Sequence, residues 1–271
     1  MDWVQQRVGT DRASIYRVYD CLLGGTDNLA ADREVFARLV GAVPDAPRMA
    51  MANRAFLRRV VCFLAAEAGI SRFLDIGSGL SASGNVHQVT WEAGCPARVL
   101  YVDDDPDVVA RSRALLSDSS TAAIIKADLH RPEEILASPE VRELLAPGQP
   151  VALTLLAVLP LIDDEDDPAG IVALLREAMP PGSYLAISHF RDTTTSHPTD
   201  AARIAGAQKL FRELFGTGNW RSHEEVLSYF GDLEMVDPGL VPLPEWRPSP
   251  GATRFQYAGY HAWVGGVARK R

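Results

Sequence analysis

Three acidic residues and two glycines are spaced so that they could form one site for a small ligand. Asp75 closes the apolar run RFLDI and is followed at once by a turn that contains Gly77 and Gly79. Asp103 ends the run ARVLYVD, and Asp128 ends the run AAIIKAD. Because glycine has no Cβ atom, backbone N–H groups in such a turn can approach a ligand closely. The pattern predicts a ligand site built from the glycine turn and the acids at the strand ends.

The glycine turn is compatible with two kinds of cofactor. Gly77, Gly79 and Ala82 match the dinucleotide fingerprint G-x-G-x-x-G/A, whereas a Walker loop is excluded because no Gly-Lys-Ser/Thr follows. No Lys or Arg lies between Asp75 and Arg98 to offset the acids, so the site would repel a pyrophosphate. S-adenosylmethionine has no phosphate, and its sulfonium and ammonium groups suit neighbouring carboxylates. We expect S-adenosylmethionine, with an NAD-dependent oxidoreductase as the alternative.

The order of the acids along the chain suggests a role for each. Asp103 would accept both ribose hydroxyls, as the acid at this place does in dinucleotide folds. Asp128, followed by Leu129, would accept an N–H from the adenine amino group, and Asp75 would orient the methionine end. Asp104 is also placed in the site, although it and the acids that follow can instead cap the next helix.

A parallel sheet would bring these residues together. From residue 72 onward, apolar runs alternate with helical segments such as PDVVARSRALLS and PAGIVALLREAM. Strands that are apolar throughout are typical of a parallel sheet covered on both faces, and such doubly wound sheets bind ligands beyond the carboxyl ends of their strands. The sequence predicts a Rossmann-like α/β domain over residues 71–271, with closing strands in LEMVDPGLVPL and YHAWVGGVAR.

The first 70 residues have a helical pattern instead. ASIYRVYDCLLGG, DREVFARLVGAV and RMAMANRAFLRRVVCFLAAEAG read as three helices, the first of them ended by Gly24 and Gly25. We predict that residues 1–70 form a helical cap. Tyr16 and Tyr19 could protrude from it toward the site.

Composition narrows the partners and the location. The 271 residues carry a net charge of -8, which disfavours binding to nucleic acid or an anionic membrane. The longest apolar run, residues 150–162, is too short to span a bilayer and reads as a buried strand. Three separated cysteines argue against disulfides and zinc knuckles, and the N-terminal residues have no secretory apolar region. We expect a cytoplasmic protein of undetermined oligomeric state.

Candidates for a general base are few. His189 ends the strand run SYLAISHF and could reach the site, but a buried structural histidine is the alternative. The histidines show no metal-ligand spacing such as H-x-x-x-H, so we expect no metal site. Methyl transfer from a sulfonium can depend largely on positioning, which contributes about 7–11 kcal/mol for well-aligned reactants. A base is needed only when the acceptor must lose a proton.

The segment after the fourth expected strand has two parts. The apolar run AVLPL is expected to line the pocket, with Ala157 near the transferable methyl group. The run DDEDDP, residues 163–168, is expected to be a solvated loop that caps the next helix.

The pieces LDIGSGL, VLYVDDDP and IKADL resemble the first three motifs of class I S-adenosylmethionine-dependent methyltransferases. SIYRVYDCLLGGTDNLAADR, ANRAFLRR and DDEDDPAGIVALLREAMPPGSYLAISH resemble, more narrowly, an actinobacterial subfamily with largely unassigned substrates, and the similarity runs nearly end to end. The resemblance implies a seven-stranded sheet with its sixth and seventh strands antiparallel, a helical cap, and methyl transfer to a small-molecule acceptor. It also implies that the cap contributes Tyr19, Gly24, Gly25, Asp27, Asn28 and Asn53 to the site.

Two positions depart from that subfamily. Thr26 replaces a common lysine, so any anion contact from that lysine is missing. Pro160 stands where a histidine often follows the fourth strand, and that histidine would be the natural base. Because a fold does not fix a function, a cofactor-binding protein that has lost methyl transfer is a further alternative.

Overall fold

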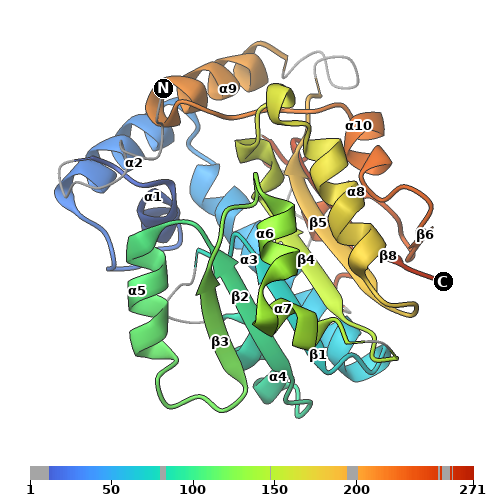
Figure 1. The fold of residues 1–271 in the computed structure, drawn as a ribbon. Coiled ribbons are helices and arrows are strands. Elements are labelled where there is room, and N and C mark those ends of the chain that lie inside the picture. Colours follow the sequence, from blue (N-terminus) through green and yellow to red (C-terminus); the bar gives the residue numbers. More distant parts are fainter. Residues whose placement is uncertain are drawn as a thin grey trace.

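A computed structural model describes residues 12–79, 84–146, 148–193, 201–249, 251, 257 and 259–271. Its strands are β1 (Arg72–Ile76), β2 (Arg98–Asp103), β3 (Ala122–Lys126), β4 (Ala152–Leu156), β5 (Tyr184–Phe190), β6 (Glu234–Met235), β7 (Val241–Pro242) and β8 (Trp263–Arg269). They form one eight-stranded sheet in the order β3-β2-β1-β4-β5-β8-β6, with β7 also paired to β8 (Figure 1). The strands β1 to β5 are parallel, and β8 runs antiparallel to β5, β6 and β7.

The predicted doubly wound, mostly parallel sheet is confirmed, but the expected count of seven strands is one too few. The run expected as a single closing strand is divided into β6 and β7, which pair with different parts of β8. Pro238 and Gly239 lie between them, and Gly239 has a φ of +87°. Proline removes a ladder donor and glycine turns the chain, so these two residues divide the run.

The helices are α1 (Ile15–Leu22), α2 (Ala30–Ala42), α3 (Ala46–Cys62), α4 (Val86–Glu92), α5 (Pro106–Leu115), α6 (Pro132–Ala137), α7 (Pro139–Leu144), α8 (Pro168–Ala178), α9 (Ala201–Phe215) and α10 (His223–Ser228). Shorter turns follow α3 at η2 (Phe63–Glu67) and β4 at η3 (Leu159–Leu161) and η4 (Asp164–Asp166). Prolines begin α5, α6, α7 and α8. A proline suits the first helical position because its missing N–H would be unpaired there anyway.

Two helical layers cover the sheet. Figure 1 shows α6, α7 and α8 in front of the strands and α3 behind them. Neighbouring strand residues enter opposite layers, as the period of two requires: Leu74 packs with the side chains of α6, α7 and α8, whereas Phe73 packs with those of α3, α4 and α5. Both faces are therefore apolar, which explains why the strand runs showed no alternation in the sequence.

The helices of residues 12–70, in the predicted cap, pack in two different places: α3 in the core against the sheet, and α1 and α2 in a separate cluster. Phe56 and Val60 of α3 are fully buried in the core beneath the sheet. Val18 and Leu39, by contrast, form a separate cluster that α9 joins through Leu210. We use "cap" below for α1, α2 and α9, and treat α3 as the layer on which α1 and α2 rest. Among the described residues, no helix combines the length and the apolar character that crossing a membrane needs.

Candidate functional site

The glycine turn and the end of β2 are joined by hydrogen bonds to one carboxylate. The N–H of Gly79 donates to Oδ2 of Asp103 at 2.9 Å, and the N–H of Asp105 donates to Oδ1 at 3.1 Å. Asp103 is only 8% exposed, and this burial raises its pKa to about 7. Each carboxylate oxygen keeps a second acceptor position, so Asp103 can still accept two hydroxyl groups from a ligand. This geometry fits the role in ribose binding predicted for it.

Gly77 and Gly79 are both required by the shape of the turn. Gly77 has a φ of +71° and Gly79 a φ of +46°, which L side chains rarely adopt. A Cβ atom on Gly77 would overlap the side chain of Val158, which follows β4. The neighbouring Ala157 has a φ of +60° and donates its N–H to the carbonyl of Ser188 at 3.0 Å. The ends of β1, β4 and β5 therefore meet at the turn, as predicted; Ala82 lies outside the described residues.

Asp75 lies below the turn in a buried position. Its Oδ1 accepts a hydrogen bond from Thr154 Oγ1 on the adjacent strand β4, and burial raises its pKa to about 6. Asp75 is 6% exposed. The carboxylate is thus held between β1 and β4, directly before the turn in the chain, and its predicted role at the methionine end stays a prediction.

Arg54 adds a cation that the sequence interpretation missed. It lies on α3, with Nη2 3.5 Å from Oδ1 of Asn85, the residue before α4. Its guanidinium also acts electrostatically to lower the pKa of Asp75, opposing the effect of burial. The segment between Asp75 and Arg98 contains no Lys or Arg, but Arg54 supplies a positive charge from α3, which lies earlier in the chain. The run ANRAFLRR contained the signal, because Asn53 was already predicted to belong to the site.

Tyr19 and Asn53 join the cap to the sheet. Tyr19 donates its hydroxyl to the carbonyl of Ala50 at 3.2 Å, and Asn53 Nδ2 donates to that hydroxyl at 3.2 Å. Ser188 Oγ on β5 donates to Asn53 Oδ1 at 2.7 Å. The chain of hydrogen bonds links α1, α3 and the end of β5. Burial raises the pKa of Tyr19, so its hydroxyl serves in this network as a neutral group.

Gly24, Gly25 and Asn28 form a local turn after α1. Gly24 has a φ of +76°, and a Cβ atom on Gly25 would overlap Asp20. Asn28 Nδ2 donates to Asp20 Oδ2 and to the carbonyl of Gly25, both at 2.9 Å. These contacts match the structural alternative for this motif, the end of a helix followed by a turn, and their predicted ligand role stays a prediction.

A cavity lies between α1, α5 and the glycine turn. Its volume is about 340 Å³, near the lower end for small-molecule pockets. It is lined by Tyr16, Tyr19, Asp20, Leu23, Asp27, Gly79, Val108, Arg111, Ser112, Ala114 and Leu115. Asp27 and Arg111 form an ion pair of 3.7 Å between the turn after α1 and α5. The cavity thus connects the cap motif with the turn that contacts Asp103.

The end of β3 lies beside the end of β2, because Ala127 donates its N–H to the carbonyl of Asp103 at 3.1 Å. Asp128 follows, with a side chain 24% exposed, and its Oδ1 is 2.7 Å from Nδ1 of His130. Leu129 is buried in the core between them. Asp104 lies at the end of β2 and acts electrostatically on His130. The residues predicted for adenine are therefore neighbours of the residue predicted for ribose.

The prediction of a catalytic base at His189 finds no support in the geometry. His189 has no exposed surface; its Nδ1 contacts the carbonyl of Phe190 at 2.7 Å, and its Nε2 lies 3.1 Å from Nη1 of Arg221. Burial lowers its pKa to about 3. A neutral imidazole with both nitrogens engaged fits the structural alternative. His189 helps to hold Arg221, which also donates to the carbonyls of Leu159 and Ile162.

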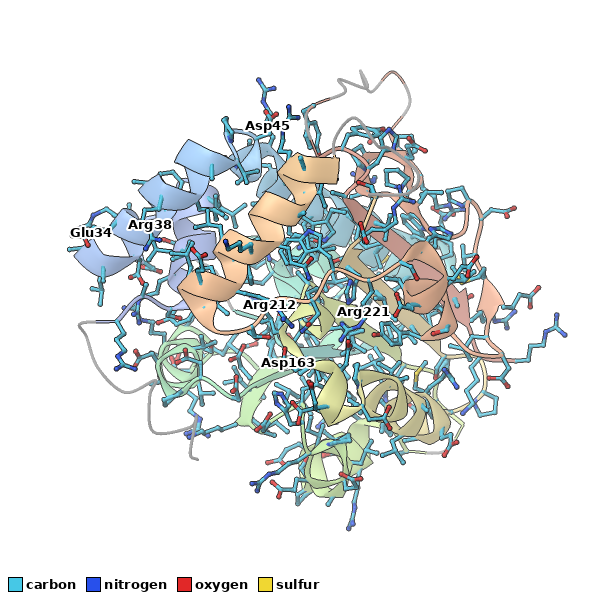
Figure 2. All side chains as sticks on the ribbon, turned by 90° about the horizontal axis from the view of Figure 1, so that it is seen from above. Glu34, Arg38, Asp45, Asp163, Arg212 and Arg221 are labelled. Atoms are coloured by element: carbon cyan, nitrogen blue, oxygen red, sulfur yellow. The ribbon has the colours of Figure 1, made fainter. Side chains whose placement is uncertain are left out.

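Several side chains of the acidic run after β4, residues 163–168, form hydrogen bonds with other parts of the chain. Asp163 accepts from Asn219 Nδ2 at 2.8 Å, and Asp164 accepts from Arg221 at 2.7 Å. Figure 2 shows Asp163, Arg212 and Arg221 close together, whereas Glu34 and Arg38 project from the outer side of α2. Asp167 caps α8 by accepting from the N–H of Gly170 at 3.0 Å, as predicted. The run is thus an exposed loop that caps the next helix, as expected, and its acids are in addition tethered to other segments.

A metal centre was not expected, and no His, Cys, Asp and Glu group suited to a metal ion occurs within the ranges that the structure describes. The polar groups around the turn are instead backbone N–H donors, carboxylate acceptors and the guanidinium of Arg54. They suit a ligand that offers hydroxyls, an amino group and a carboxylate, as S-adenosylmethionine does.

The comparison with known proteins agrees with S-adenosylmethionine as the ligand that these groups suit. The family model of S-adenosyl methyltransferases matches residues 1–271. A provisionally assigned methyltransferase from Thermobifida fusca YX is 36% identical, with a TM-score of 0.90 and 100% of both chains covered. A DUF574 family protein from Streptomyces avermitilis MA-4680 is also 36% identical, with a TM-score of 0.87, covering 97% of this chain and 99% of its own.

More distant structures share the fold alone. Mitomycin 7-O-methyltransferase MmcR is 18% identical with a TM-score of 0.52, covering 95% of this chain and 69% of its own. No protein of curated function matches the chain. On the full-length family match and the two close structures, the chain belongs to the S-adenosyl methyltransferase family and is an S-adenosylmethionine-dependent methyltransferase.

Proposed function

We propose that the cofactor lies across the carboxyl ends of β1, β2 and β3 and donates its methyl group to a small-molecule acceptor. The observation that carries the proposal is the carboxylate of Asp103, held by the N–H groups of Gly79 and Asp105 with acceptor capacity left over. Its ionised form suits two ribose hydroxyls. When bound, the cofactor supplies a methyl group already activated by its sulfonium.

The other parts of the site follow from this placement. Asp128 and Leu129 receive the adenine at the next strand end, and Gly77 lets the methionine end approach the backbone. Arg54 lies beside the turn and supplies the positive charge for the methionine carboxylate. Asp75 offers negative charge beneath the same turn and balances the ammonium group.

The acceptor is proposed to occupy the cavity between α1 and α5. The cavity reaches Gly79, and its volume of about 340 Å³ suits a small molecule rather than a polymer segment. The net charge of -8 also disfavours nucleic acid as an acceptor. The cap motif that lines the cavity would then set acceptor specificity.

Catalysis is proposed to depend on positioning. The acceptor lone pair forms the new bond to the methyl carbon while the carbon–sulfur bond breaks and its electron pair stays on sulfur. His189 is engaged with Arg221 and the Phe190 carbonyl, and Pro160 stands at the other expected base position. The residues of this chain therefore align the acceptor, which must reach the site as a nucleophile that needs no strong side-chain base.

A cytoplasmic location is part of the proposal. The three cysteines, Cys21, Cys62 and Cys95, are free thiols, which suits a reducing compartment.

The cofactor part is tested by calorimetric titration of the wild type and Asp103→Ala with S-adenosylmethionine and S-adenosylhomocysteine. Micromolar binding by the wild type, weakened at least about 100-fold in the variant, is expected because two hydroxyl partners are lost. Wild-type protein that binds neither compound would overturn the site assignment.

The acceptor part is tested by release of S-adenosylhomocysteine with small molecules, peptides and nucleic acids as acceptors. Ala114→Trp fills the cavity from an exposed position of α5, and Ala110→Trp places the same bulk on α5 outside the cavity lining. Turnover of a small molecule should be lost only in Ala114→Trp, while both variants still bind S-adenosylhomocysteine. Equal turnover in the two variants would place the acceptor elsewhere.

A further inference from the structure

His130 lies among acidic residues that follow three different strands. Its Nδ1 is 2.7 Å from Asp128 Oδ1, and its Nε2 is 3.7 Å from Asp166 Oδ2 in the loop after β4. Asp104, after β2, also acts on it electrostatically. No other histidine of the described chain has this position at the predicted adenine site. The sequence alone does not single out His130, because its partner Asp166 is distant from it along the chain.

Two hydrogen bonds between His130 and the Asp128 side chain involve the same carboxylate oxygen. The backbone N–H of His130 donates to Oδ1 at 2.9 Å, and the ring Nδ1 contacts the same oxygen at 2.7 Å. Within the described ranges, both of these hydrogen bonds go to Oδ1 and none to Oδ2. The carboxyl group is therefore fixed in orientation, with its second oxygen directed away from His130. The side chain of Asp128 keeps 24% exposure, so part of it remains accessible to a ligand.

The surrounding charges stabilise the pair formed by His130 and Asp128. The hydrogen bond with Asp128 raises the pKa of His130, and the other two carboxylates act in the same direction. Burial acts to raise the pKa of Asp128, but the hydrogen bonds from His130, together with the charges of His130 and Arg131, lower that pKa. An ionised carboxylate beside an imidazolium is a charge-assisted hydrogen bond, which is stronger and more directional than a neutral one.

We propose that His130 is a positioning residue for adenine recognition, which holds Oδ1 of Asp128 so that Oδ2 accepts the 6-amino group of the cofactor. Its far nitrogen ties the loop after β4 to the same strand end through Asp166. This inference rests on the proposed function, because it requires adenine to lie at Asp128. It adds a base-selectivity device that acts through a residue without direct ligand contact.

The chemistry of the purine provides a specific test. Adenine offers an amino donor at position 6, whereas hypoxanthine offers an oxo acceptor there, which a fixed carboxylate oxygen repels. S-adenosylhomocysteine and S-inosylhomocysteine differ at position 6 and in the proton that hypoxanthine carries on N1, so the test compares the preference between variants instead of reading it from the wild type alone. A site built to accept an N–H rejects an analogue that lacks it, here by about 100-fold or more. The ratio of the two dissociation constants therefore reports on the orientation of Asp128, and partial unfolding does not change it because both ligands bind the same folded fraction.

The experiment is calorimetric titration of the full chain with both compounds, for the wild type, His130→Ala, His130→Asn and Asp128→Asn. In His130→Ala the binding of S-adenosylhomocysteine should weaken about tenfold, and the preference for adenine should fall by a similar factor. In His130→Asn the amide can still donate to Oδ1, so the preference should largely return. In Asp128→Asn the amide can donate to the oxo group, so the preference should vanish or invert.

Arg131→Ala is the matched control, because it removes a neighbouring exposed positive charge that acts on Asp128 only electrostatically, while the backbone N–H of residue 131 keeps its hydrogen bond to the Asp128 carbonyl. It should leave the preference unchanged. A preference that is unaffected in His130→Ala, not restored in His130→Asn, or equally lost in Arg131→Ala would overturn the positioning role. Wild-type protein that binds neither compound would instead overturn the proposed function and this inference with it.

Discussion

The backbone N–H of Gly79 donates to the carboxylate of Asp103 at 2.9 Å, so the glycine turn after β1 is held directly by the residue that ends β2. The glycine turn is positioned by the same side chain that we place against the ribose. Binding at one of these elements is thus coupled to the geometry of the other.

We predict that cofactor affinity falls as the pH drops below about 7. Burial raises the pKa of Asp103 to about 7, whereas ribose hydroxyls that donate to the carboxylate favour its ionised form and lower that pKa on binding. Affinity is then complete above pH 7 and lost as the pH falls, by up to tenfold per unit. Titration with S-adenosylhomocysteine between about pH 5.5 and 8.5 measures this dependence.

Two variants identify the titrating group. Asp103→Asn should bind weakly and with little change over this pH range. Asp75→Asn should keep the slope near neutral pH, because the pKa of Asp75 is raised only to about 6. A flat profile for the wild type would exclude Asp103 as the group that must ionise.

We predict that Arg54→Gln weakens S-adenosylhomocysteine about 10–100-fold, because a charged hydrogen bond to the methionine carboxylate is lost. The control is the ligand itself: 5′-methylthioadenosine has the same nucleoside but no carboxylate. Its affinity should not change in the variant. An equal loss for both ligands would mean that Arg54 supports the turn instead of contacting the methionine end.

Gly77→Ala should destabilise the protein by about 2–4 kcal/mol, because both backbone strain and overlap with Val158 oppose the new methyl group. Gly24→Ala is the matched variant: its φ of +76° is similar, but no atom lies within 4 Å of the new Cβ. It should cost only the strain, about 1 kcal/mol. Urea unfolding of both variants gives the difference, and equal losses would show that Val158 does not restrict the turn.

Arg221→Ala should lower the free energy of unfolding by about 2–3 kcal/mol, since the Nε2 of His189 loses its donor and the buried carbonyls of Leu159 and Ile162 each lose one of two donors. Arg212→Ala removes a half-exposed arginine that pairs with Asp163 at 3.6 Å and donates to the Gly218 carbonyl and to Asn219 Oδ1. Because these contacts are partly solvated, their loss should cost only about 1 kcal/mol. Thermal and urea unfolding measure both. Similar losses in the two variants would contradict the buried role of Arg221.

His189 gives a pH dependence of stability with a definite sign. Its pKa is lowered to about 3 by burial, so the neutral form is favoured in the folded state. The stability contributed is complete above the usual pKa near 6.5 and is lost as the pH falls toward about 3. His189→Asn should flatten the acid side of the stability profile, and once an acceptor is known it should retain turnover within a few-fold.

The proximity of the candidate cofactor residues could be predicted because they end successive strands of one parallel sheet. Asp103 and Asp128 each close an apolar run, and strand pairing alone makes such residues neighbours. Gly77 and Gly79 were recognisable because few residues other than glycine adopt positive φ beside a packed side chain. These inferences depend on local order plus one topological rule.

The parts that were missed depend on contacts between distant segments. Arg54 reaches the turn from a helix, and Asp166 reaches His130 from another crossover; neither pairing has a sequence period. His189 was ambiguous for the same reason, since its partner Arg221 lies beyond the whole of α9. The division of the last expected strand was readable in principle from Pro238 and Gly239, but strand pairing was needed to show that both halves join β8.

The tethered loop after β4 also limits how relatives of this chain can diverge. Asp163, Asp164, Asp166 and Asp167 contact Asn219, Arg221, His130 and Gly170, which lie on three separate parts of the chain. Inserting or deleting one residue within the run would shift the acids on one side of the change out of register with their partners. Variation in loop length among descendants of this architecture should therefore accumulate elsewhere, and the cap, whose outer helices rest on a small cluster of their own, is the region free to change.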